Sequence, residues 1–110
     1  MTAHRPDLIP GTLDMLILQT VSAAPMHGYG IAQHIGRLSR DVLHVEEGSL
    51  YPALQRLQKK GWIKSRWGQT ATRRRARFYS ITASGRRQLG VERSNFDLAL
   101  QAIRRVLGTA

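Results

Sequence analysis

Apolar residues recur at intervals of three and four positions in several stretches of this chain, which is the spacing of helices with one buried face. The first predicted helix begins at Thr12, whose hydroxyl can cap free amides, and ends just before Pro25, because proline disfavours a helical residue in front of it. The second covers residues 28–39. The third begins after Glu47 and ends at Gly61, which suits the left-handed cap of a helix.

Aromatic and β-branched residues then replace the helical spacing, and this change predicts a two-stranded hairpin. The strands are residues 62–67 and 77–81, and Gly68 lies between them. The tryptophans of the first strand are expected to pack the hairpin against the core. The connecting loop, residues 68–75, is longer than the roughly two to five residues of most hairpin loops, so we expect a mobile tip that orders on a ligand.

A fourth helix is predicted after Thr82, which can cap its first turn. Its apolar residues follow one another at spacings of seven, four, three and four, a coiled-coil-like seam that predicts pairing with a second copy of the chain. The direction of the paired helices stays open, because the seam covers fewer than three heptads. Its members are Leu89, Phe96, Leu100, Ile103 and Leu107.

Three helices, a hairpin and a final helix, with the third helix leading directly into the hairpin, describe a winged helix-turn-helix with an appended helix. The predicted fold class is therefore mainly α with a β-hairpin. Residues 1–81 are expected to form the winged helix-turn-helix DNA-binding domain and residues 82–110 the C-terminal dimerisation helix. The two parts should form one compact unit, because splitting 110 residues would leave cores too small to be stable.

The charge of the chain is concentrated in its second half. Of the formal net charge of +10, residues 1–55 contribute −2 and residues 56–110 contribute +12. Nine Lys or Arg residues and no Asp or Glu fall within residues 56–77. Such a local excess favours a phosphate backbone as partner. Proteins that bind an anionic membrane surface usually do so through a basic amphipathic helix, whereas the arginines here fall on the hairpin.

Candidate DNA contacts lie on the third helix and the hairpin. On the helix face opposite the leucines, Gln can read adenine and Arg can read guanine through paired hydrogen bonds. A Ser at a helix start can both cap the helix and bind phosphate, and adjacent arginines repel one another unless an anion lies between them. The alternative for this face is an ordinary solvated surface, and long cations can simply cover apolar surface. The candidates are Ser49, Tyr51, Gln55, Arg56, Lys59, Lys64, Arg73, Arg74 and Arg75.

The sequence contains no group of residues that resembles a catalytic or metal-binding site. His27 and His34 lack a cysteine or a close carboxylate pair that would complete a metal site, so packing or helix capping is their expected role. Glu46 and Glu47 are adjacent and diverge in direction. The chain has no cysteine, no uninterrupted apolar leader and no apolar run near the roughly 20 residues that span a bilayer. We expect a cytoplasmic protein that is not an enzyme and needs no cofactor.

Four segments of the sequence resemble the PadR-like transcriptional regulators. The Tyr-Pro pair at the start of the third helix is the most specific feature of this resemblance. Two positions depart from the pattern: Pro10 stands where relatives often carry a basic residue, and the hairpin loop lacks the glycine that many relatives have. The segments are GTLDMLIL at 11–18, MHGYGIAQ at 26–33, EEGSLYPALQRLQKKGWI at 46–63 and RFYSITASGRRQL at 77–89.

The resemblance implies a homodimeric bacterial repressor that binds a palindromic operator through its third helix and its wing. It also implies that the last helix makes the dimer, as in relatives with a single C-terminal helix. Some relatives bind a flat aromatic effector between the dimer helices, and Phe96 is the aromatic residue in that region of this chain.

Two other functions stay open from the residues alone. An RNA-binding or ribosome-associated winged helix would be equally basic, although duplex RNA hides its major groove from side chains. An interaction module could use the last helix to pair with a different chain, and the mass of the isolated protein would separate that case from a homodimer.

Overall fold

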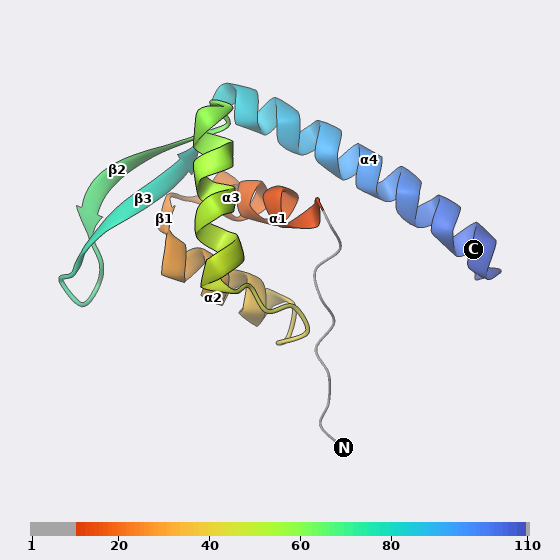
Figure 1. Cartoon of the computed structure of the whole chain (residues 1–110), viewed down its shortest axis with the longest axis horizontal. Coiled ribbons are helices and arrows are strands. Elements are labelled where there is room, and N and C mark those ends of the chain that lie inside the picture. The colour runs from red at the N-terminus through yellow and green to blue at the C-terminus, as the bar shows by residue number, and fades with distance from the viewer. Residues whose placement is uncertain (1–10, 110) are drawn as a thin grey trace, which may run out of the picture.

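A computed structural model describes residues 11–109 of the chain and contains four helices and a three-stranded antiparallel sheet (Figure 1). The predicted class, a mainly α winged helix-turn-helix followed by a further helix, is confirmed. The hairpin projects from one side of the helical body and the last helix from another. The elements are α1 (Thr12–Ala23), β1 (Met26–His27), α2 (Gly28–Leu38), α3 (Glu47–Lys59), β2 (Ile63–Gln69), β3 (Arg75–Ile81) and α4 (Ala83–Leu107).

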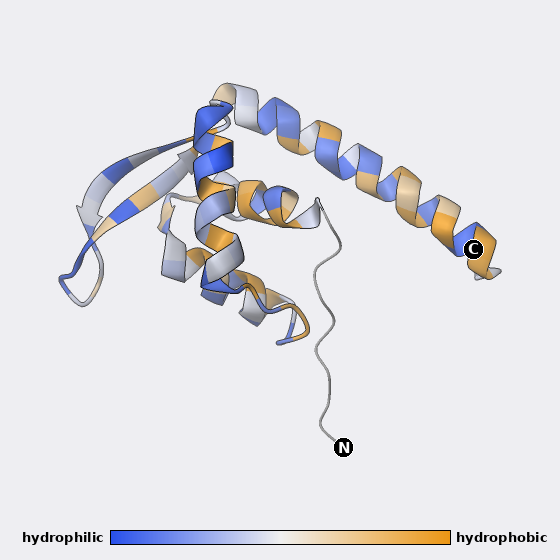
Figure 2. Ribbon diagram, viewed as in Figure 1, coloured by the Kyte–Doolittle hydropathy of each residue, from blue (hydrophilic) through white to orange (hydrophobic). Residues whose placement is uncertain are grey.

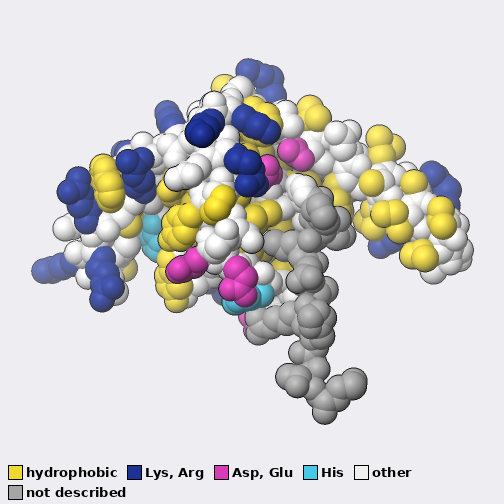
Figure 3. Space-filling model, viewed as in Figure 1, with side chains coloured by type: hydrophobic (Ala, Val, Ile, Leu, Met, Phe, Trp, Pro, Cys, Tyr) yellow, Lys and Arg dark blue, Asp and Glu magenta, His cyan; other side chains and the backbone are white. Residues whose placement is uncertain are grey.

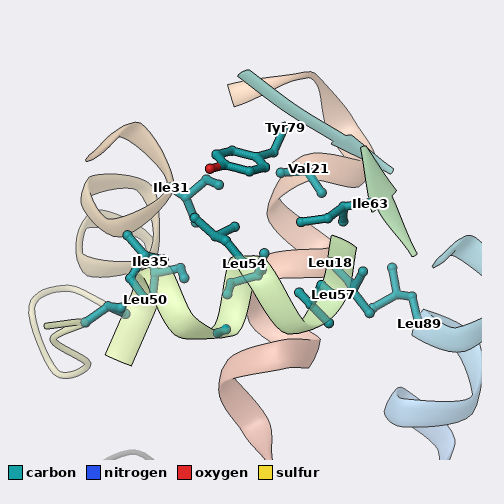
Figure 4. Packing of buried hydrophobic residues seen from close by; sticks show 13 residues of the cluster. Leu18, Val21, Ile31, Ile35, Leu50, Leu54, Leu57, Ile63, Tyr79 and Leu89 are labelled. Atoms are coloured by element: carbon teal, nitrogen blue, oxygen red, sulfur yellow. The ribbon is translucent and has the colours of Figure 1, made fainter. Parts of the chain in front are cut away.

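The hydrophobic core joins α1, α2 and α3 to the base of the sheet (Figure 4). Leu54 and Leu57 of α3 are at most 1% exposed and lie among core residues of the other elements. Burial of each such side chain stabilises the fold by about 1.5 to 3 kcal/mol. The largest fully buried side chains are Ile17, Leu18, Val21, Ile31, Leu50, Leu54 and Leu57.

Strand β3 lies in the middle of the sheet, whose order is β1-β3-β2. Strand β1, with Met26 opposite Tyr79, was not predicted, because two residues are too short to show an alternating pattern. It ties the start of α2 to the hairpin.

The prediction of an eight-residue hairpin loop at 68–75 is wrong. The pairing of β2 with β3 continues to Gln69 opposite Arg75, which leaves a loop of residues 70–74. Thr70 closes this loop, because its amide donates to the Arg74 carbonyl at 2.8 Å and its hydroxyl oxygen accepts from the Arg74 amide at 3.2 Å. Arg73 takes the left-handed conformation that the tight turn requires, with φ of 63°.

The helix boundaries follow the predicted caps at Gly61 and Thr82 but differ at Thr12 and at Ser49, which lies inside α3 while Glu46 occupies the capping position. Gly61 has φ of 75°, as a left-handed cap requires, and the Thr82 hydroxyl oxygen accepts from the Gly85 amide at 3.1 Å. The same hydroxyl donates to the Gly61 carbonyl at 2.6 Å and so joins the end of α3 to the start of α4. Thr12, predicted as a cap, is instead the first residue of α1, and Gly11 occupies the capping position.

Helix α4 packs on α1 from its start to the region of Phe96. Arg86 donates to the Ser22 carbonyl at 3.3 Å, and Arg93 donates to the Gln19 side chain at the same distance. Leu89 enters the core and is 8% exposed. Residues 101–107 are all exposed, and Figure 1 shows this end of the helix extending away from the body.

We predict that Gly85→Ala destabilises the fold by about 2 to 3 kcal/mol, the usual effect of overpacking. A Cβ atom at Gly85 would overlap the carbonyl oxygen of Trp62, which is backbone and cannot rotate away. Urea unfolding followed by circular dichroism measures the change. Gly90→Ala is the matched control, because no atom lies within 4 Å of a Cβ there. It should gain up to about 1 kcal/mol from helix propensity. Equal effects at both positions would contradict the packing argument.

Candidate nucleic-acid interface

The leucine stripe of α3 determines which of its side chains face outward. Because Leu50, Ala53, Leu54 and Leu57 are buried, the opposite side of the helix is open to solvent. Four of the predicted contact residues lie exposed on this helix without an ion pair in the described chain: Ser49, Tyr51, Gln55 and Lys59.

Arg56 has a partner within the protein. Its guanidinium donates to the carboxylate of Asp14 at 2.9 Å, and this ion pair joins α3 to the first turn of α1. Asp14 is 18% exposed at its side chain, so the pair is partly shielded from solvent. The structure therefore places this predicted contact residue against α1, where it holds α3 in position.

The wing, defined here as β2, β3 and the loop between them, carries an aromatic and cationic face. The Arg75 guanidinium carbon lies 4.5 Å from the centre of the Trp67 ring, and that of Arg77 lies 5.0 Å away. Contacts of this kind are attractive because the ring face is electronegative. They hold two cations on one face of the wing. Figure 3 shows Lys and Arg side chains gathered at the hairpin end of the molecule.

The expectation that both tryptophans pack the wing on the core is wrong for Trp67. Trp62 is half-buried and packs against the core, whereas Trp67 is 54% exposed. Both strands direct alternate side chains to one face, and that face covers the core at Ile63 but passes beyond it at Trp67. Trp62 precedes β2 and lies beside the buried Ile63, whereas Trp67 lies farther along the strand, beyond the core.

The other cations predicted to contact DNA lie at the tip of the wing or on its opposite face. Arg73 and Arg74 are exposed in the loop at its tip. Lys64 is exposed and pairs with Ser80, so it lies on the opposite face of the hairpin from Trp67. The structure brings Arg74 and Arg75 toward α3 but does not bring Lys64 there.

A hollow of about 910 Å³ lies between the wing, the start of α2 and the N-terminal part of α3. We call it the wing hollow. It contains three predicted residues, Tyr51, Arg74 and Arg75, and none of the residues that line it is acidic. Its aromatic and basic lining residues are His27, Tyr29, Tyr51, Trp67, Arg74, Arg75, Arg77 and Tyr79.

Sequence reasoning missed Tyr29, Trp67, Arg77 and Tyr79 as members of this site. The pairing of Trp67 opposite Arg77 was the available signal, since residues opposite each other in a hairpin share one face. Tyr79 carried no such signal, because a strand tyrosine beside the core is ordinarily a packing residue. Burial raises the pKa of the Tyr79 phenol above its ordinary value. The charge of Arg77 lowers this pKa by less than burial raises it, and Tyr51 raises it further, so the hydroxyl stays protonated near neutral pH.

Of the two histidines singled out in the sequence, His27 caps a helix and His34 lies beside an arginine. The His27 Nδ1 atom accepts from the Gly30 amide at 3.0 Å and so caps α2, as expected, and its ring meets Phe78 edge to face. His34 lies 3.5 Å from the Arg37 guanidinium. Within residues 11–109, no three His, Cys, Asp or Glu side chains gather as a metal site would require. No helix of the described chain has the length and apolar character needed to cross a bilayer.

The residues predicted for dimerisation separate into a buried and an exposed group. Leu89 belongs to the protomer core, so its side chain is not available to a partner. Phe96 and Leu100 are half-buried, and Phe96 lines a pocket of about 330 Å³ with Met15 and Leu16 of α1. Ile103 and Leu107 are 53% and 69% exposed.

Further exposed apolar residues lie on α4 outside the predicted seam. Val91 and Leu98 are 51% and 65% exposed and are seven residues apart, so they share a second face of the helix. Val106, near the C-terminal end, is 87% exposed. Figure 2 shows apolar residues recurring along α4 to its end.

Solved structures of similar fold come from several bacteria. A transcriptional regulator from Clostridium thermocellum has 28% sequence identity and a TM-score of 0.79, and the match covers 86% of this chain and 92% of that one. A PadR-like transcriptional regulator from Bacillus cereus has 26% identity and a TM-score of 0.74, over 88% of this chain and 92% of that one.

The sequence comparisons agree with these structures. An uncharacterised protein of Lysinibacillus sphaericus is 33% identical over 85 residues, which are 77% of this chain and 78% of that protein. The family described as "Transcriptional regulator PadR-like family" matches residues 17–91, which include α2, α3, the wing and the first turns of α4. The chain therefore belongs to the PadR-like family of DNA-binding transcriptional regulators.

Proposed function

We propose that this protein is a sequence-specific transcriptional repressor that binds a palindromic operator as a homodimer. The observation that carries the proposal is the arrangement of the exposed face of α3, the wing hollow and the cationic face of the wing around one opening. Family membership supports DNA as the partner. Repression and the palindrome follow from the resemblance to dimeric family members.

The proposed division of labour assigns specificity to α3 and affinity to the wing. Tyr51 and Gln55 are exposed on α3, which has the size to enter a major groove, where a Gln side chain can pair with adenine. Arg73, Arg74 and Arg75 lie at the tip of the wing and would contact phosphates, which carry no sequence information. Ser49 and Lys59 flank the base-reading residues and would contact the backbone.

The proposed dimer uses the far half of α4. The face that packs on α1 continues through the half-buried Leu100 to Ile103 and Leu107, which nothing within the described protomer covers. A second copy has the same uncovered face, and pairing would place two α3 helices to meet half-sites about 34 Å apart.

The pocket at Phe96 is a candidate site for a planar aromatic effector. It lies between α1 and α4, so a bound molecule would change how the dimer helix sits on the winged domain. Aromatic compounds should then shift the NMR signals of Phe96 and change DNA affinity together. Compounds that alter neither leave Phe96 as a packing residue.

Selection of genomic fragments by the purified protein at near-physiological salt tests the proposed function. We expect one inverted-repeat sequence to be enriched over bulk DNA. If about six phosphates are neutralised, log affinity should fall against log salt with a slope of about −5. Binding without an enriched sequence would favour an architectural or RNA-binding role over a repressor.

The same selection with variants separates the two contact surfaces. Replacing Arg73, Arg74 and Arg75 with Ala should weaken binding to all sequences alike, because the lost contacts are to phosphates. Gln55→Ala should relax one base position and lower affinity for the selected site by about 1 to 3 kcal/mol. Identical effects of the two variants on affinity and on base preference would contradict the assignment of specificity to α3 and of affinity to the wing.

Leu107→Glu should convert the dimer to a monomer, because it places a charge on the uncovered apolar face of α4. Light scattering coupled to size-exclusion chromatography measures the mass. Gln101→Glu adds the same charge to an exposed position of the same helix and should leave the dimer intact. A monomeric wild-type protein, or a dimeric Leu107→Glu variant, would rule out this interface.

A further inference from the structure

A side-chain contact joins α3 to both strands of the wing, and the hydroxyl of Ser65 in β2 is its centre. The Gln58 side-chain amide of α3 donates to the Ser65 hydroxyl oxygen at 3.1 Å. The Arg77 guanidinium of β3 donates to the same oxygen at 3.0 Å. A serine hydroxyl oxygen has two lone pairs, so it can accept both hydrogen bonds at once. Three elements therefore meet at a single atom.

Ser65 lies where one face of β2 passes from the core to solvent. Alternate residues of a strand point to the same face, so Ser65 shares its face with the buried Ile63 and the exposed Trp67. The residue paired with it on β3 is Tyr79, which is 7% exposed. Ser65 itself is half-buried, and a hydrogen bond is stronger where water is partly excluded. Serine is not among the residue types enriched in strands, so strand formation alone does not account for it.

The Arg77 guanidinium is held from two directions before any ligand arrives. Its carbon lies 5.0 Å from the centre of the Trp67 ring, and Ser65 accepts from one of its nitrogens. An exposed arginine normally samples many rotamers, and losing this freedom on binding lowers affinity. Arg77 is exposed but already ordered. Because Ser65 also accepts from Gln58, the position of this cation is fixed relative to α3 as well as to the wing.

We propose that Ser65 is a positioning residue for DNA binding, which acts by fixing Arg77 of the wing relative to α3. The inference rests on the proposed function and adds to it a residue that works through another side chain. Arg75 provides a comparison within the same face. Its guanidinium lies over the same Trp67 ring, but it makes no side-chain hydrogen bond within the part of the chain that the structure describes.

Ser65→Thr and Ser65→Val test the proposal, because the two new side chains have nearly the same shape and only threonine keeps the hydroxyl. Affinity for a mixed-sequence duplex should stay near the wild-type value in Ser65→Thr. It should fall about three- to tenfold in Ser65→Val, the effect of having to order one free side chain on binding. The NMR signal of the Trp67 indole should shift in Ser65→Val alone, because Arg77 then moves over the ring. Circular dichroism and urea unfolding check that both variants are folded and equally stable.

Two further backgrounds show whether Ser65 acts through Arg77. In the Arg77→Gln protein, Ser65→Val should cause no further loss of affinity, because the cation that the hydroxyl positions is gone. Arg75→Gln is the matched control, since it removes a cation from the same ring without touching the contact at Ser65. In that background Ser65→Val should weaken duplex binding by about as much as it does in the wild-type protein.

Equal duplex affinities of Ser65→Val and Ser65→Thr would overturn the proposal. An equal loss from Ser65→Val in the Arg77→Gln and Arg75→Gln backgrounds would also overturn it, because Ser65 would then act on the fold and not on Arg77. If the wild-type protein binds no duplex, the proposed function fails, and the role of Ser65 in DNA binding fails with it. A Trp67 shift confined to Ser65→Val would in that case still show that Ser65 holds Arg77 in place.

Discussion

Packing of α1 on two sides is the constraint on which the remaining structure depends. Its residues Ile17 and Leu18 are fully buried, and the helix contacts both α3 and α4. One polar contact lies on each side of α1. Asp14 forms an ion pair with Arg56 of α3, and the Gln19 side chain accepts a hydrogen bond from Arg93 of α4. The helix proposed to read DNA and the helix proposed to form the dimer are therefore oriented by the same element. Any change in how α4 sits on α1 would alter the separation of two α3 helices in a dimer.

The wing shows how paired strands can carry a concentrated positive charge. Antiparallel pairing continues to Gln69 opposite Arg75, and Thr70 closes the turn, so the arginines stand on a defined backbone. The Trp67 ring attracts the Arg75 and Arg77 guanidiniums, which partly offsets the repulsion between them. The wing thus has an ordered cationic face within the protomer, whereas a mobile loop would have to be ordered by its ligand at an entropic cost.

The helices could be predicted from the sequence because their signals are local: apolar spacing, Gly61 as a left-handed cap, and Thr82 as a capping residue. The parts that could not be predicted depend on pairing between distant residues. The Asp14–Arg56 ion pair joins residues 42 positions apart, and β1 is defined by its place beside β3. The burial of Leu89 is of the same kind, since a seam pattern does not show which of its members face the same chain. The wing hollow combines residues of β1, α2, α3 and the wing, so no single segment contains its signal.

The uncovered half of α4 links the stability of the protomer to its assembly. A helix stays formed in water mainly through packing of its apolar face, and short unpacked segments are marginal even with good caps. The end of α4 has a left-handed cap at Gly108, with the Thr109 amide donating to the Arg104 carbonyl at 2.9 Å, but Val106 and Leu107 remain exposed. In the proposed dimer the partner supplies the missing packing. Order at the end of α4, the spacing of the two α3 helices and affinity for a two-part operator would then all depend on protein concentration, because each requires the same pairing of helices.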